Sequence, residues 1–271
     1  PEMLKVMLER VVTEAGVQLF YHTWFSEAFM EGRTITGVIV ENKSGRGGIL
    51  AKRVIDASGD ADVAFQAGVE TVSGRKEDNK NHPKSLRFIL GHVDLEKAQD
   101  FLCSLGDFDW TDNDYDPEVP LWTSACTWNK EWPLTPLFQK ALAEGIIEEQ
   151  HASYFQIFTI PGRPGEVAFN CPRIDNAVKS LDFRELSRVQ IEGKRLILGY
   201  LEFCRRYLPG FEKAYLVQIA PMVGVRESRR IVGEYTLTAD DFFEARKFPD
   251  AIARNNYPID IHNRDGKGGL F

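Results

Sequence analysis

Residues 49–68 read ILAKRVIDASGDADVAFQAG, and two different hydrophobic patterns meet inside this stretch. Residues 49–57 form a short and mostly apolar run, which predicts a buried strand. Residues 60–67 have the composition of a short helix, and Gly68 is placed to end it. The stretch therefore predicts a strand, a tight turn and a helix, and the rest of the chain is interpreted around it.

The turn between the predicted strand and helix consists of Ser58, Gly59 and Asp60. Gly59 has no Cβ, so a ligand or another backbone can approach it closely. Asp60 is expected to cap the helix by accepting a hydrogen bond from its first turn. Two interpretations stay open, because the turn is either a capped connection in the core or the rim of a nucleotide pocket. In the second case its carboxylate suits ribose or ribityl hydroxyls better than a pyrophosphate.

Composition and charge exclude several classes of protein. The chain has 271 residues, of which 43% are hydrophobic and 27% charged, with a formal net charge of −7. An acidic chain is a poor partner for nucleic acid, and no apolar run approaches the ~20 residues of a membrane span. Cys103, Cys126, Cys171 and Cys204 are far apart and lack metal-ligand spacing, so we expect no metal site, free thiols and a cytoplasmic location.

The segments before the turn predict a helix followed by an antiparallel meander. Residues 3–12 carry an apolar helical stripe, which Gly16 ends. Extended segments are expected over residues 17–24, 26–30 and 34–41. The segments after the turn predict a mixture of strands and helices. Strands are expected at 85–93, 154–160, 166–170 and 215–220, and helices at 94–104, 137–147, 183–207 and 238–246. The fold class is therefore mixed α and β.

Three arginines form the second candidate site. Arg226, Arg229 and Arg230 have the spacing that would put three guanidinium groups on one face of a helix. A solvated face is the ordinary interpretation of such a cluster. The alternative is a site for a substrate carboxylate or another developing negative charge.

Two further groups of polar residues follow strands. Asn170, Arg173 and Asp175 come after one of them, and His262 ends the apolar segment that begins at Tyr257. A lone histidine is more often structural, although a general acid is conceivable at this place. The loop over residues 107–136 contains four tryptophans and is interpreted as packing first and substrate contact second.

An ordered set of short motifs resembles one known family. The chain contains neither GxGxxG nor GxxxxGK[ST]. It does contain, in this order, IDASGDADVA at 55–64, AG at 67–68, GR at 74–75, the residues Asn170, Arg173 and Asp175, EGKR at 192–195, PGF at 209–211, GVRESRRIVG at 224–233 and YPIDIH at 257–262. In this set the sequence is similar to the FAD-dependent oxidoreductases related to the flavin subunit of heterodisulfide reductases.

The resemblance implies a function and a division of the chain. It implies a partial FAD-binding domain of the two-dinucleotide type with an antiparallel meander at 1–82, a mixed-sheet substrate domain at 83–221, and a segment returning to the FAD-binding domain at 222–271. The chain resembles the central part of such an enzyme, without its Gly-rich pyrophosphate motif and its last flavin-contacting segment. We therefore expect the parent enzyme to transfer a hydride between FAD and a small organic molecule. We expect this chain alone to be inactive and not to hold FAD tightly.

The resemblance also implies roles for particular residues. Catalytic roles fall to Arg226, Arg229 and His262, contact with FAD to Ser58, Gly59 and Asp60, and substrate binding to Asn170, Arg173 and Arg230. The expected partner is a small-molecule substrate, with neither nucleic acid nor membrane, and the oligomeric state is left open. The alternative is a non-enzymatic domain that binds a ligand or a protein through the tryptophan-rich loop and the arginine face.

Overall fold

The computed structural model describes residues 2–106, 109–110, 122–126, 132–174, 179–255, 261–262 and 269–270. For 109–110, 122–126, 261–262 and 269–270 the backbone alone is described. The chain divides into two compact units, and each is described here by itself. Unit 1 comprises Pro1–Val72 and Arg229–Thr236, and unit 2 comprises Ser73–Ser228 and Leu237–Phe271. The predicted domains divided the chain after residues 82 and 221, and that assignment remains a prediction.

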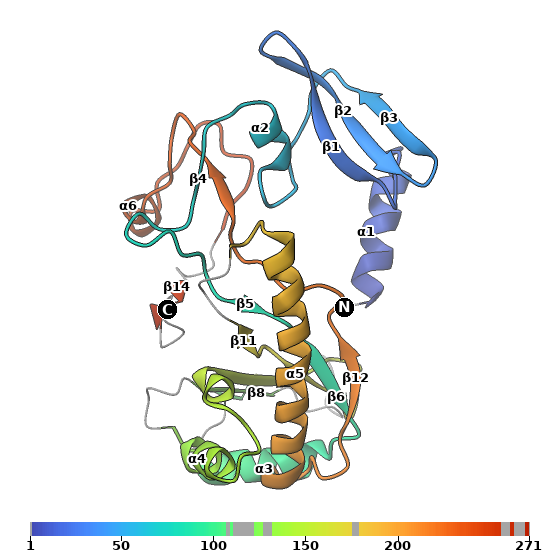
Figure 1. Ribbon diagram of the computed structural model, residues 1–271. Coiled ribbons are helices and arrows are strands. Elements are labelled where there is room, and N and C mark those ends of the chain that lie inside the picture. The colour runs from blue at the N-terminus through green and yellow to red at the C-terminus, as the bar shows by residue number, and fades with distance from the viewer. Residues whose placement is uncertain are drawn as a thin grey trace. The chain divides into compact units, whose positions relative to one another are not determined.

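Unit 1 contains the predicted helix and meander. Helix α1 (Glu2–Glu14) precedes strands β1 (Trp24–Glu31), β2 (Thr34–Asn42) and β3 (Gly45–Leu50), which form one antiparallel sheet in the order β1-β2-β3 (Figure 1). A two-residue turn joins β2 to β3, so β3 begins at Gly45 rather than at the predicted residue 49. The meander is thus confirmed in part. Strands β1 and β2 correspond to the predicted segments 26–30 and 34–41, and β3 includes only the first two residues of the strand predicted over 49–57.

Two strands predicted in unit 1 are wrong. Residues 51–57 are not a strand, and Ile55 is 90% exposed instead of buried. Residues 17–23 likewise carry no strand, since β1 begins only at Trp24. A strand requires a partner for its backbone hydrogen bonds, and neither segment is paired among the described strands. The apolar composition of these two segments was therefore not sufficient to make them strands.

The helix that follows the turn is shorter than expected. Helix α2 (Asp62–Gln66) begins after Ala61, which has left-handed backbone angles and makes no side-chain cap. Asp60 therefore does not cap α2, contrary to the prediction. Strand β4 (Thr71–Ser73) follows and pairs with β13 (Arg229–Ile231) in a two-stranded sheet. This pairing brings the arginine segment to the part of unit 1 that contains α2.

Unit 2 is built on a six-stranded sheet with the order β12-β6-β10-β9-β8-β7. Its strands are β6 (Phe88–Gly91), β7 (Asp109–Trp110), β8 (Trp122–Cys126), β9 (Phe155–Thr159), β10 (Val167–Phe169) and β12 (Tyr215–Ile219). All five neighbouring pairs in this sheet are antiparallel. Two short pairs accompany it, β5 (Lys84–Ser85) with β11 (Arg173–Ile174) and β14 (Ile261–His262) with β15 (Gly269–Leu270).

Helices supply the other half of the unit 2 core. They are α3 (Leu95–Leu105), α4 (Thr135–Ala143), the 3-10 helix η1 (Glu149–Ser153) and α5 (Phe183–Tyr207). Helix α6 (Ala239–Phe243) also belongs to unit 2 but contributes no residue to this core. The longest, α5, runs along the sheet in Figure 1, and its Tyr200 ring lies 6.1 Å from Phe88 and 6.0 Å from Phe155 between centroids. Phe88 and Phe169 stack at 4.2 Å. Burial of such aromatic area is the main stabilising contribution to this core.

Helix caps in unit 2 follow the sequence closely. Asp94 accepts a hydrogen bond from the Lys97 N–H at 3.1 Å at the start of α3, and Asp182 accepts from Arg184 and Glu185 at the start of α5. Thr238 caps α6. These caps satisfy N–H groups that have no partner inside the helix. Among the helices of the described residues, none is long and apolar enough to cross a membrane.

Candidate functional site

The turn in unit 1 is held by the carboxylate of Asp56. It accepts hydrogen bonds from the Ser58 N–H at 3.0 Å, the Ser58 hydroxyl at 2.7 Å and the Ala64 N–H at 3.0 Å. Burial works to raise the pKa of Asp56, but the hydrogen bonds from Ala64 and Ser58 outweigh it, so the pKa lies below its usual value. Asp56 therefore stays ionised and fixes the path of the chain from Ser58 to α2.

The Ser58 hydroxyl is fully used inside the turn. It donates to Asp56 and accepts a hydrogen bond from the Asp62 N–H at 3.0 Å. Gly59, by contrast, is exposed and has φ +82, and a Cβ added there would meet nothing within 4 Å. Glycine adopts this conformation without strain. The turn thus presents open backbone at Gly59, while Ser58 has a structural role.

Arg229 ties β13 to this turn within unit 1. Its Nε donates to the carbonyl oxygen of Asp60 at 2.8 Å, and its second terminal nitrogen forms an ion pair with Asp62. The guanidinium also lies over the Phe65 ring, 4.5 Å from the centroid. These three interactions engage the guanidinium group of Arg229, so its observed role is to hold residues 60–65 in place.

The three arginines do not form one helical face, contrary to the prediction. Arg229 and Arg230 are neighbours on strand β13, where successive side chains point to opposite faces. Arg226 precedes that strand, is exposed, and belongs to unit 2. The helix was predicted from spacing alone, but β13 is recruited into an extended conformation by its pairing with β4.

In unit 2 the structure brings Asn170 together with two residues that the sequence did not single out. Asn170 lies opposite Gln156 across β10 and β9, and its Nδ2 donates to Gln156 Oε1 at 2.6 Å and to the Tyr154 hydroxyl at 3.3 Å. The Tyr154 hydroxyl donates to Gln156 Oε1 at 2.6 Å. The signal available in the sequence was the two-residue spacing of Tyr154 and Gln156 at the start of strand β9. This spacing puts both side chains on the face of the hairpin that also carries Asn170.

Two predicted arginines also belong to this group. Arg173 is 6% exposed, and its guanidinium carbon lies 3.6 Å from the centre of the Tyr154 ring. Burial raises the pKa of Tyr154, and the charges of Arg173 and Arg226 partly oppose that rise. The charges of both arginines thus act on the Tyr154 phenol. We call these five residues, Tyr154, Gln156, Asn170, Arg173 and Arg226, the unit 2 polar cluster.

The structure does not describe the side chains of several predicted site residues. Asp175 and most of the tryptophan-rich loop lie outside the described residues. The backbone of His262 is in β14, but its side chain also lies outside them. Arg230 is exposed on β13 in unit 1 and does not belong to the unit 2 polar cluster. Across the residues that are described, no group of three or more His, Cys, Asp or Glu side chains is arranged to hold a metal ion.

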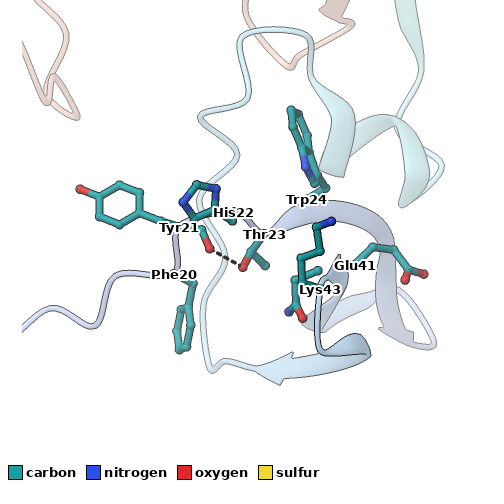
Figure 2. A pocket seen from close by; sticks show the side chains of 8 residues that line it. Phe20, Tyr21, His22, Thr23, Trp24, Glu41 and Lys43 are labelled. Carbon is teal, nitrogen blue, oxygen red and sulfur yellow. Dashed lines mark hydrogen bonds between the residues drawn. The ribbon is translucent and has the colours of Figure 1, made fainter.

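A hollow of about 810 Å³ lies elsewhere in unit 1, lined by residues 20–24 and 41–43. Figure 2 shows that Phe20, Tyr21 and Trp24 point in different directions there and do not converge. The only hydrogen bond drawn in that view joins the Thr23 hydroxyl to the Tyr21 carbonyl oxygen at 3.0 Å. A ligand site needs a few convergent polar groups, so we assign no site to this hollow.

Comparison with known proteins identifies the family. Residues 1–270 match the family described as FAD dependent oxidoreductase, and the chain belongs to that family. No curated protein matches it, and no solved structure matches it. The match runs through both compact units and confirms the resemblance to FAD-dependent oxidoreductases. The match does not test the more specific relation to the flavin subunit of heterodisulfide reductases.

Proposed function

We propose that this protein takes part in hydride transfer between FAD and a small organic substrate. Membership of the FAD dependent oxidoreductase family over residues 1–270 supports the general chemistry. When bound, FAD accepts or returns the hydride. The residues of the chain bind the two reactants, orient them and compensate their charge.

The turn from Ser58 to Asp60 is proposed to border FAD. The observation that carries this assignment is the open left-handed backbone at Gly59, where a Cβ would meet nothing within 4 Å. Gly59 would allow close contact with the cofactor, and Asp60 would face its hydroxyl groups. Ser58 supports the turn through Asp56, and Arg229 supports it through Asp60 and Asp62. Arg229 is thus proposed as a positioning residue.

The unit 2 polar cluster is proposed to bind the substrate. Asn170, Arg173 and Arg226 contribute to it, and a few polar groups of this kind fix the orientation of a ligand in its site. The roles of Arg230 in substrate binding and of His262 as a general acid remain predictions. The chain alone is proposed to hold FAD only weakly, because its sequence lacks a glycine-rich phosphate-binding motif.

The first prediction concerns Gly59. Gly59→Val should lower FAD affinity about tenfold or more, because its side chain fills the space beside the turn. Fluorescence titration of FAD into the purified chain measures this loss.

Gly32→Val is the matched control for that titration. Gly32 is in the β1–β2 turn of the same unit, has φ +59 and also has nothing within 4 Å of an added Cβ. Both variants suffer the backbone strain of a β-branched residue at positive φ, and thermal unfolding monitors it. Equal FAD affinity in the two variants contradicts the proposed FAD contact.

A further inference from the structure

One acceptor in the unit 2 polar cluster is left without a donor. Both hydrogen bonds of the Asn170 side chain are made by its Nδ2, which fixes the orientation of the amide. Its Oδ1 is buried and accepts no hydrogen bond from the residues that the structure describes. A buried acceptor without a donor costs free energy, so a ligand that brings an N–H or O–H to this oxygen gains that energy on binding.

Positive charge lies beside this acceptor. Arg173 is fixed over the Tyr154 ring, and the Gln150 amide donates to its carbonyl oxygen at 3.3 Å. Arg226 is exposed and makes no hydrogen bond or ion pair with any part of the chain that the structure describes. Its guanidinium is therefore available, and its charge acts on Tyr154, the residue over which Arg173 lies.

Strand pairing brings the segment that leads to Arg226 beside the strand that pairs with Arg173. Ser85 pairs with Arg173 through β5 and β11, and on its other side Ser85 exchanges two backbone hydrogen bonds with Gly224, at 3.3 and 2.7 Å. Arg226 follows Gly224 by two residues, and residues two apart on an extended chain share a face. The strand pairing therefore directs Arg226 to the side of Arg173.

We propose that the unit 2 polar cluster binds a small organic carboxylate that also carries a hydroxyl or amino group. Arg226, supported by Arg173, pairs with the carboxylate, and Asn170 Oδ1 accepts a hydrogen bond from the hydroxyl or amino group. This inference rests on the proposed function, for which it names the substrate class.

The acceptor distinguishes a carboxylate of this kind from phosphate. A guanidinium fork pairs with either anion. Inorganic phosphate near neutral pH carries only one or two O–H groups on four oxygens, so it can donate to Asn170 Oδ1 only by giving up one of its oxygens as a partner for the guanidinium groups. A hydroxy or amino acid places a donor there instead.

The experiment compares matched pairs of small molecules on the purified chain by ligand-observed NMR titration. The pairs are lactate with propanoate, alanine with propanoate, and β-hydroxybutyrate with butyrate, and inorganic phosphate is the further probe. We expect at least one molecule with a donor to bind about three- to tenfold more tightly than its partner without one. Phosphate should bind more weakly than that molecule.

Two variants and a control locate the effect. Arg226→Gln should weaken binding of every carboxylate about tenfold or more, and Asn170→Ala should remove the preference for the molecule with the donor. Arg184→Gln makes the same charge change at an exposed position near the start of α5 and should leave binding unchanged. Because Arg226 is exposed, its replacement is not expected to disturb folding, which circular dichroism verifies.

The inference is overturned if no carboxylate binds, if phosphate binds best, or if Arg226→Gln binds carboxylates as the wild type does. None of these titrations contains flavin. Failure here therefore leaves the FAD titration with Gly59→Val unaffected, and failure of that titration leaves carboxylate binding to be judged separately.

Discussion

At the scale of single residues, Arg229 shows how local geometry changes the meaning of a motif. Its spacing from Arg226 and Arg230 predicted a helical face open to a substrate, but it lies on a strand. There its guanidinium contacts the Asp60 carbonyl oxygen, the Asp62 carboxylate and the Phe65 ring. We therefore expect that replacing Arg229 mainly lowers the stability of unit 1.

Arg229→Gln should lower the free energy of unfolding by about 1–2 kcal/mol, because it removes charged hydrogen bonds, of which the one to Asp62 is partly screened by solvent. Urea denaturation followed by fluorescence measures this change. The control is Arg230→Gln, which alters the adjacent, exposed position on the same strand and should have a smaller effect. If the two variants lose equal stability, the interactions of Arg229 do not hold the turn.

The polar residues of unit 2 were only partly predictable. Asn170 and Arg173 could be selected because they follow a strand closely. Tyr154 and Gln156 were missed, although hairpin register places Gln156 opposite Asn170. Arg226 was selected for a helical face, but it precedes β13 in unit 2, where its charge acts on Tyr154. Spacing along the chain could not give this grouping, because it depends on the pairing of Ser85 with both Arg173 and Gly224.

At the scale of elements, helix α5 packs closely against η1 at Gly199, where the backbone of α5 approaches the His151 ring. His151 Nε2 lies 3.0 Å from the Leu196 carbonyl oxygen, and the Glu148 N–H donates to His151 Nδ1 at 3.1 Å. Burial lowers the pKa of His151, which keeps the ring neutral and able to do both. A Cβ on Gly199 would come within 2.3 Å of Nε2, so glycine is required there for packing.

Gly199→Ala should therefore destabilise the protein by about 1–3 kcal/mol through overpacking, although alanine favours a helix by about 1 kcal/mol over glycine. Thermal unfolding measures the difference. Ser187→Ala, at an exposed position on α5, should stay within about 0.5 kcal/mol of the wild type. A stabilised Gly199→Ala protein would mean that η1 does not pack on α5 in this way.

The elements that were predicted correctly carry their signals within their own sequence. Helix α5 has a continuous apolar stripe over 25 residues and a cap at Asp182, and the β9–β10 hairpin has its own turn. Residues 51–57 were wrongly predicted as part of a strand, because an apolar run does not specify a partner. The arginine segment failed because its partner, β4, is more than 150 residues away in the chain, as Arg229–Ile231 pairs with Thr71–Ser73.

At the scale of the whole molecule, we propose different tasks for the two compact units. Unit 1 contains the Gly59 turn, for which we propose contact with FAD, and unit 2 contains the polar cluster, for which we propose contact with the substrate. The family match covers both units, as a shared function requires. The division of tasks between the two units depends above all on where FAD contacts this chain.

Hydrogen–deuterium exchange of the purified chain, with and without excess FAD, tests that point most directly. We predict slower exchange over residues 56–66, because contact at Gly59 restricts the turn and the start of α2. The hollow formed by residues 20–24 and 41–43 serves as the internal comparison and should exchange equally in both samples. Unchanged exchange at 56–66, or protection confined to that hollow, would contradict the proposed FAD site.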